Sequence, residues 1–192
     1  DLGARIIKVE PPMGDDSREF SPFINEQSAY FASLNREKES IKIDLKDEKD
    51  KIIFDALLEK SDILIENYKP GTMAKLGYGY EKLSKKFPNL IYASCSGFGQ
   101  TGPWASKPAY DMIVQGMGGL MSVTGHEGQE PVRVGTSIGD ITAGLFTTIG
   151  ILAALIDKKN INKGQSIDIS MLDCQIAILE NAIARYLSKN EI

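Results

Sequence analysis

The chain has 192 residues, 42% of them hydrophobic and 25% charged, which is an ordinary composition for a soluble globular protein. Its formal net charge of −4 argues against a nucleic-acid partner, and no apolar run approaches the ~18 residues of a membrane span, so we expect no membrane partner. Cys95 and Cys174 lie far apart, and the single histidine, His126, is near neither, so we expect no metal site, no disulfide framework and a cytoplasmic location.

The first half of the chain alternates strand patterns with helix patterns. Strands are expected over residues 5–10, 40–45, 63–68 and 90–96, with helices over 48–60, 70–76 and 80–87. Asp47 is the expected N-cap of the helix over 48–60, and residues 13–28 are expected to form a loop. This alternation predicts an α/β fold in which one doubly wound, mostly parallel sheet contains these strands and has helices on both faces.

Glycine and proline punctuate residues 97–135, where the alternation ends. We expect a helix over 111–121, a loop or hairpin over 122–136, a helix over 139–158, a strand over 165–169 and a helix over 171–187. The chain opens on Asp1 instead of methionine and stops soon after the last helix, so we expect a piece of a longer protein. The apolar residues of 139–156 and 171–187 are then expected to leave apolar surface uncovered.

Asp140 stands between a loop rich in Gly, Ser and Thr and the apolar run 145–156. At a helix start, the helix dipole and free backbone N–H groups favour an ionised carboxylate, which a nucleophilic aspartate needs. An aspartate in this position is more often only an N-cap. Local sequence leaves both interpretations open.

Of three other motifs, the first is rejected as a dinucleotide site and the other two are ambiguous. Residues 97–102 match G-x-G-x-x-G, but Pro103 and Pro108 prevent the following helix that a dinucleotide site requires. Asn67 and Tyr68 lie at the end of a strand, where they could bind a polar group and stack on a flat ring, or simply precede a turn. Asp111 is either a helix cap or a second acid.

Several longer segments carry a stronger signal than these motifs do. They are Gly3–Pro11, Glu66–Met73, Leu90–Pro103, Tyr110-Asp111, Gly118–Gly125, Gly139-Asp140 and Gly164-Gln165. In this order they resemble the class III coenzyme A transferases, also called the CaiB/BaiF family, and the resemblance runs from Leu2 to about Leu187.

The resemblance implies an α/β large domain, a second, smaller domain, and two chains interlocked as a homodimer. The whole chain, 1–192, would be part of the large domain, with strand–helix alternation over 5–100, the active-site region over 97–145 and helical segments over 139–187. It would lack the start of that domain and all of the smaller one.

The family's catalytic aspartate falls on Asp140. Its coenzyme A contacts fall on Asn67, Tyr68, Lys75, Leu76 and Tyr110. Lys75 lies where the family often has arginine. The positive charge is kept, but the bidentate hydrogen bonding of an arginine guanidinium is lost. Coenzyme A is expected as a substrate, with no tightly bound cofactor.

The expected activity is transfer of coenzyme A between carboxylic acids, through a mixed anhydride and an aspartyl thioester on Asp140. Two alternatives remain. One is an isomerase like the α-methylacyl-CoA racemases of the family, although their histidine base is replaced here by Tyr110. The other is a non-catalytic nucleotide-binding or assembly domain.

Overall fold

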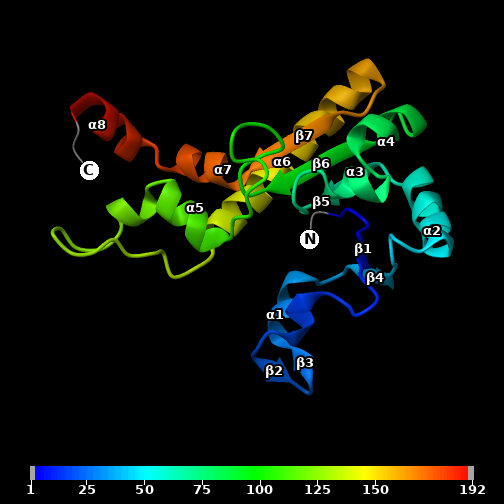
Figure 1. Ribbon diagram of the computed structural model, residues 1–192, viewed down its shortest axis with the longest axis horizontal. Coiled ribbons are helices and arrows are strands. Elements are labelled where there is room, and N and C mark those ends of the chain that lie inside the picture. Colours follow the sequence, from blue (N-terminus) through cyan, green and yellow to red (C-terminus); the bar gives the residue numbers. More distant parts are fainter. Residues whose placement is uncertain (1–2, 190–192) are drawn as a thin grey trace. The chain divides into compact units, whose positions relative to one another are not determined.

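The structure is a computed structural model that describes residues 3–189 (Figure 1). The chain divides into two compact units, the first ending at Lys60 and the second beginning at Ser61.

The first unit contains a two-stranded parallel sheet. β1 (Ile7–Glu10) pairs with β4 (Glu39–Lys42), and Ile7 lies opposite Glu39. The other elements are the 3-10 helix η1 (Asp16–Glu19), the antiparallel pair β2 (Phe23–Ile24) and β3 (Gln27–Ser28), and the helices α1 (Ala29–Leu34) and α2 (Glu48–Glu59).

Two sequence predictions for this unit have different outcomes. Asp47 is the N-cap of α2, as expected, and its carboxylate accepts hydrogen bonds from the N–H groups of Lys49 and Asp50. The prediction of a loop over 13–28 is wrong in part, because this stretch contains η1 and the β2–β3 pair. Its turn uses positive φ angles at Asn25 and Glu26, residue types that carry no strong turn signal together.

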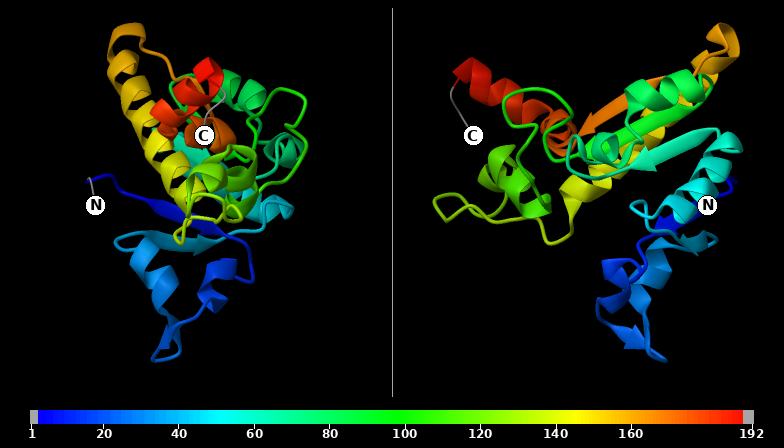
Figure 2. Two further views of the ribbon diagram at one scale, coloured as in Figure 1. Left: turned by 90° about the vertical axis from the view of Figure 1, so that its left-hand side faces the viewer. Right: turned by 45° about the vertical axis from the view of Figure 1, so that its right-hand side comes forward.

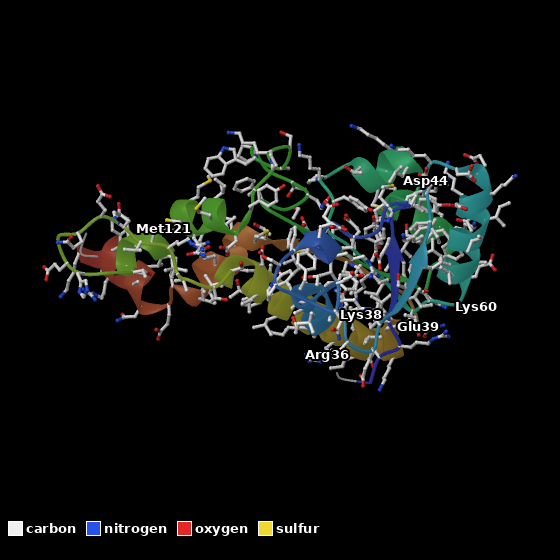
Figure 3. The ribbon with its side chains drawn as sticks, turned by 90° about the horizontal axis from the view of Figure 1, so that it is seen from below. Arg36, Lys38, Glu39, Asp44, Lys60 and Met121 are labelled. Carbon is white, nitrogen blue, oxygen red and sulfur yellow. The ribbon has the colours of Figure 1, made fainter. Side chains whose placement is uncertain are left out.

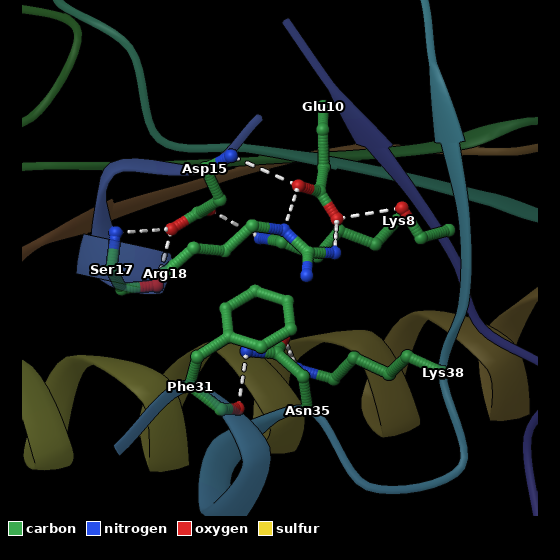
Figure 4. Close-up of polar contacts among 9 residues, drawn as sticks. Lys8, Glu10, Asp15, Ser17, Arg18, Phe31, Asn35 and Lys38 are labelled. Atoms are coloured by element: carbon green, nitrogen blue, oxygen red, sulfur yellow. Dashed lines mark hydrogen bonds and ion pairs between the residues drawn. The ribbon is translucent and has the colours of Figure 1, made fainter. Parts of the chain in front are cut away.

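A buried ion pair ties the end of β1 to the segments around it (Figure 4). The Glu10 side chain is fully buried, and its carboxylate accepts two hydrogen bonds from Arg18, each 2.7 Å long. It also accepts from the Ser40 hydroxyl and from the Asp15 N–H. The Arg18 guanidinium lies 3.9 Å from the centre of the Phe31 ring. These bonds, chiefly the one from Arg18, lower the pKa of Glu10 to about 2.

We predict that Arg18→Ala destabilises the fold by roughly 2 kcal/mol, because it leaves the buried Glu10 carboxylate without its cation. This energy is set below that of a fully buried ion pair because the Arg18 side chain is 40% exposed. Urea unfolding followed by circular dichroism measures the change. Arg5→Ala is the matched control, since Arg5 pairs with Glu39, labelled in Figure 3, at the surface. Equal losses in both variants would contradict the prediction.

The second unit is built on a three-stranded parallel sheet in the order β5–β6–β7. These strands are β5 (Ile63–Glu66), β6 (Ile91–Ser96) and β7 (Ser166–Ser170). The helices are α3 (Thr72–Leu76), α4 (Tyr80–Lys86), α5 (Asp111–Met117), the 3-10 helix η2 (Leu120–Val123), α6 (Ile138–Ile161), α7 (Met171–Ile178) and α8 (Asn181–Lys189).

Helices cover both faces of this sheet (Figure 2). On one face the Tyr92 ring of β6 meets the edge of Tyr80 on α4 at 5.9 Å between centroids. Cys95 points to the opposite face, where it packs near Ala143 of α6. The doubly wound parallel α/β arrangement is therefore confirmed. The expectation that all four early strands share one sheet is wrong, because the structure pairs them in two separate parallel sheets.

Two predicted helices end early. The helix expected over 111–121 stops at Met117, and Gly119, with a φ of 88°, starts η2. The helix expected over 171–187 breaks at Glu180, whose φ of 44° is left-handed and ends a helical run. A non-glycine residue in this conformation has no sequence signal, so the break could not be foreseen.

Helix α6 carries an exposed apolar stripe, as the sequence analysis expected. Its members are exposed by 47% to 67%, and they are Ile141, Leu145, Ile149, Leu152 and Ile156. By length and composition α6 could cross a membrane, with a mean hydropathy of 1.7 over 18 residues, so the expectation that no segment passes this test is wrong. One such helix is weak support for a span, because core helices pass the same test.

Candidate active site

A cavity of about 490 Å³ lies in the second unit, between α6 and the carboxyl ends of β5 and β6. Its lining is mainly apolar with a few polar groups, and Asp140 is the one carboxylate among the described residues that line it. The lining residues are Ile65, Asn67, Cys95, Asp140, Ala143, Gly144, Thr147, Thr148, Ile151 and Met171. Parallel α/β sheets bind ligands at this edge, so the cavity is the candidate active site.

Asp140 is the third residue of α6, in its first turn. The N-cap is Ser137, so the interpretation of Asp140 as the cap of this helix is wrong. The Asp140 side chain is therefore free of the role that an aspartate at a helix start most often has.

Asp140 is an exposed residue, but protein atoms around its carboxylate exclude part of the surrounding water, and this is the chief reason that its pKa is raised. The negative charge of Asp111 is the second reason. The sequence analysis expected the opposite, an ionised form favoured by the helix dipole. The raised pKa makes this carboxylate more basic than an ordinary aspartate.

The position of Asp111 explains why the helix dipole of α6 does not determine the pKa of Asp140. Its side chain is 7% exposed, and its Oδ1 accepts a 2.8 Å hydrogen bond from the N–H of Gly139, at the start of α6. The positive end of the α6 dipole is thus already occupied by a carboxylate other than Asp140. The sequence left Asp111 as a cap or a second acid, and only the fold brings it to α6.

The residues expected to contact coenzyme A occupy several elements. Asn67, directly after β5, lines the cavity with Asp140. Tyr68 is half-exposed, and its N–H donates to the carboxylate of the buried Glu66. Tyr68 does not line the cavity, and neither do the other three, which are Lys75 and Leu76 in the last turn of α3 and Tyr110, 82% exposed, at the N-cap of α5.

Cys95 lines the cavity but was not expected there. Burial raises the pKa of its thiol, a hydrogen bond with Thr147 partly offsets this, and the charges of Asp140, Glu66 and Asp168 raise it further. A thiol with a raised pKa is a poor nucleophile at neutral pH. Asp140 is therefore the better candidate for covalent chemistry.

No group of three or more His, Cys, Asp or Glu side chains within residues 3–189 is arranged to hold a metal ion. The chemistry available to this part of the chain is that of a basic carboxylate in a largely apolar cavity, beside an amide and a neutral thiol.

Comparisons with known proteins identify the family of the chain. The model of CoA-transferase family III matches residues 1–192, and the chain belongs to this family. It is 52% identical over 185 residues to the acetyl-CoA:oxalate CoA-transferase of Acetobacter aceti, covering 95% of the chain and 48% of that protein. It is 43% identical over 189 residues to the succinyl-CoA:glutarate CoA-transferase of Mus musculus, covering 97% and 43%.

A solved structure shows the same fold. The crystal structure of a CAIB/BAIF family protein from Brucella suis superposes with a TM-score of 0.95 at 41% identity, covering 100% of this chain and 52% of that one. The family resemblance expected from the sequence is confirmed. The chain spans about half the length of the curated relatives it matches.

We predict that Asp111→Asn lowers the pKa of Asp140, because it removes the nearby negative charge that is the second cause of the raised value. Carbon-13 NMR titration of the aspartate carboxyl groups measures it. Asp157→Asn, a change near the other end of α6, is the control and is expected to leave that pKa unaltered. A pKa of Asp140 that stays constant in Asp111→Asn would contradict the prediction.

Proposed function

We propose that the protein transfers coenzyme A between carboxylic acids, with Asp140 as the covalent nucleophile. The observation that carries the proposal is the Asp140 carboxylate, which is not the N-cap of α6 and lies in the first turn of that helix, at the cavity beside Asn67. Membership of CoA-transferase family III and the names of the relatives support it.

The first half of the reaction loads coenzyme A onto the protein. A carboxylate oxygen of Asp140 attacks the carbonyl carbon of the acyl-CoA thioester, the C–S bond breaks, and the thiolate leaves with the electron pair. The product is a mixed anhydride between Asp140 and the acyl group. The thiolate then attacks the aspartyl carbonyl carbon, releases the donor acid as its carboxylate and leaves an aspartyl thioester.

The second half runs in reverse with the acceptor. The acceptor carboxylate attacks the aspartyl carbonyl carbon, expels the thiolate and forms a new mixed anhydride. Thiolate attack on the acyl carbonyl then gives the product thioester and restores the Asp140 carboxylate. No step consumes or releases a proton. Each carbonyl oxygen becomes negative in turn and needs N–H donors, but the Gly139 N–H already donates to Asp111, so other donors must serve.

Coenzyme A is expected to contact Asn67, Tyr68, Lys75, Leu76 and Tyr110. The half-exposed Tyr68 ring can stack on a flat base, and the exposed Lys75 can pair with a phosphate. Among the residues that the structure describes, no lysine or arginine lines the cavity itself, which suits an uncharged thioester more than a phosphate. The cavity would then hold the thioester end, with the nucleotide outside it.

The names of two relatives support a choice of substrates. Their names pair acetyl-CoA with oxalate and succinyl-CoA with glutarate, so short dicarboxylates are the first acids to test. An interlocked homodimer in the cytoplasm, with neither nucleic-acid nor membrane partners, is part of the same proposal.

We predict that Asp140→Asn in the full-length protein lowers the transfer rate by orders of magnitude, because a carboxamide cannot form the anhydride. Its fold should survive: the pKa of Asp140 is raised, so the ionised side chain costs native stability as the pH rises through that pKa. The assay follows coenzyme A exchange between two carboxylic acids.

Tyr110→Phe is the matched control for Asp140→Asn and should do much less harm to transfer, because Tyr110 is assigned to binding. Full transfer activity in Asp140→Asn would remove the nucleophile assignment. Deuterium uptake at the α-carbon of a branched acyl-CoA, measured in parallel, tests the racemase alternative. Uptake without transfer in the unmodified protein would favour that alternative.

We predict that replacing Asn67 and Tyr68 together with alanine weakens coenzyme A binding to the full-length protein and leaves its fold intact. Asn67 loses its amide at the cavity, and Tyr68 loses an exposed ring. Calorimetric titration with coenzyme A measures the affinity, and circular dichroism checks the fold. An unchanged affinity would place the binding site elsewhere.

A further inference from the structure

Two buried side chains of α5 hold the backbone that leads into Asp140. Asp111 is 7% exposed and Gln115 is fully buried, and a spacing of four residues puts them on one face of the helix. The Gln115 side-chain amide donates a 2.7 Å hydrogen bond to Asp111 Oδ2. The two side chains therefore act as one unit.

This unit contacts three backbone groups just before Asp140. Asp111 Oδ1 accepts from the Gly139 N–H at 2.8 Å. Gln115 Oε1 accepts from the Val134 N–H at 2.8 Å, and its Nε2 lies 3.4 Å from the carbonyl oxygen of Thr136. Residues 130–137 have no regular secondary structure, so these bonds replace the ladder bonds that a strand or helix would supply.

Close packing reinforces the contact at Gly139. A Cβ atom at this position would stand 2.7 Å from Val114 Cγ2 and 3.1 Å from Asp111 Oδ1, so the start of α6 can lie this close to α5 only with glycine there. On the other side, the fully buried Gln175 of α7 donates to the backbone carbonyl of Gln115 at 3.3 Å. The unit formed by Asp111 and Gln115 is thus also held by the buried side chain of Gln175.

We propose that Asp111 and Gln115 form a clamp that positions the Asp140 carboxylate for transfer. The inference rests on the proposed function. Both are positioning residues: they act on the backbone at Val134, Thr136 and Gly139, and through it on Asp140. A nucleophile that moves by about 1 Å can lose on the order of 100-fold in rate, so a clamp on the adjacent backbone has leverage over kcat.

The donor and acceptor pattern of the pair allows a sharp test. In Asp111→Asn the new NH2 group faces the Gln115 NH2 group, and in Gln115→Glu two carboxylates face each other. The double variant D111N/Q115E restores a donor opposite an acceptor. In the double variant the carboxamide oxygen at position 111 can still accept from Gly139, and the carboxylate at position 115 can still accept from Val134. The long contact with the Thr136 carbonyl is lost, because a carboxylate has no N–H to donate.

The experiment measures kcat and KM for coenzyme A transfer in the full-length protein and amide hydrogen exchange over residues 130–141. Each single variant is expected to lower kcat by roughly 10- to 100-fold with KM for the acyl-CoA within about 3-fold, and to speed exchange. The double variant is expected to recover most of both losses. A purely structural role would not lower kcat in a variant that stays folded at the assay temperature.

Asp157 and Gln165 supply the matched control. The Gln165 amide donates to Asp157 at 2.7 Å, the same chemistry near the far end of α6. D157N and Q165E are expected to leave kcat unaltered. Single variants at 111 and 115 that keep wild-type kcat, or a double variant no better than the worse single, would overturn the clamp. Unchanged exchange would overturn it without reference to activity, whereas an unmodified protein that transfers nothing would overturn the proposed function.

Discussion

The position of Asp140 depends on one close contact, between the first turn of α6 and α5. The glycine before Asp140 lets the two helices approach until a Cβ atom would no longer fit between Gly139 and Val114. The Gly139 N–H then reaches the buried carboxylate of Asp111. With the start of α6 held in this way, Asp140 lies at the cavity beside the carboxyl ends of β5 and β6. The candidate chemistry follows from this packing.

The same contact determines the electrostatic environment of Asp140. A helix start attracts a negative charge, and local sequence suggested that Asp140 would benefit. In the structure Asp111 takes this place, and Asp140 is left with partial desolvation and a like charge nearby. Both raise its pKa. A carboxylate in this setting is more basic, which suits the proposed attack on a thioester carbonyl.

The features of the fold that local sequence patterns control could be predicted from the sequence. The order of the main strands and helices, the Asp47 cap and the position of Asn67 near the carboxyl end of a strand all follow from periodicity and capping rules, which act within a few residues. The family resemblance supplied the role that we propose for Asp140. The membership of each sheet and the break at Glu180 depend on tertiary contacts and on backbone angles, which leave no local pattern. Gln115 was missed as well, although its spacing from Asp111 is visible in the sequence, because only the fold shows what the pair holds.

The covalent role of Asp140 can be measured directly. The full-length protein is incubated with an acyl-CoA and then with hydroxylamine, which converts an aspartyl thioester or anhydride to a hydroxamate. Peptide mass spectrometry then locates the modified residue. The account predicts a hydroxamate on Asp140 that forms only when acyl-CoA is present. A hydroxamate on another residue, or transfer with no modified residue, would contradict it.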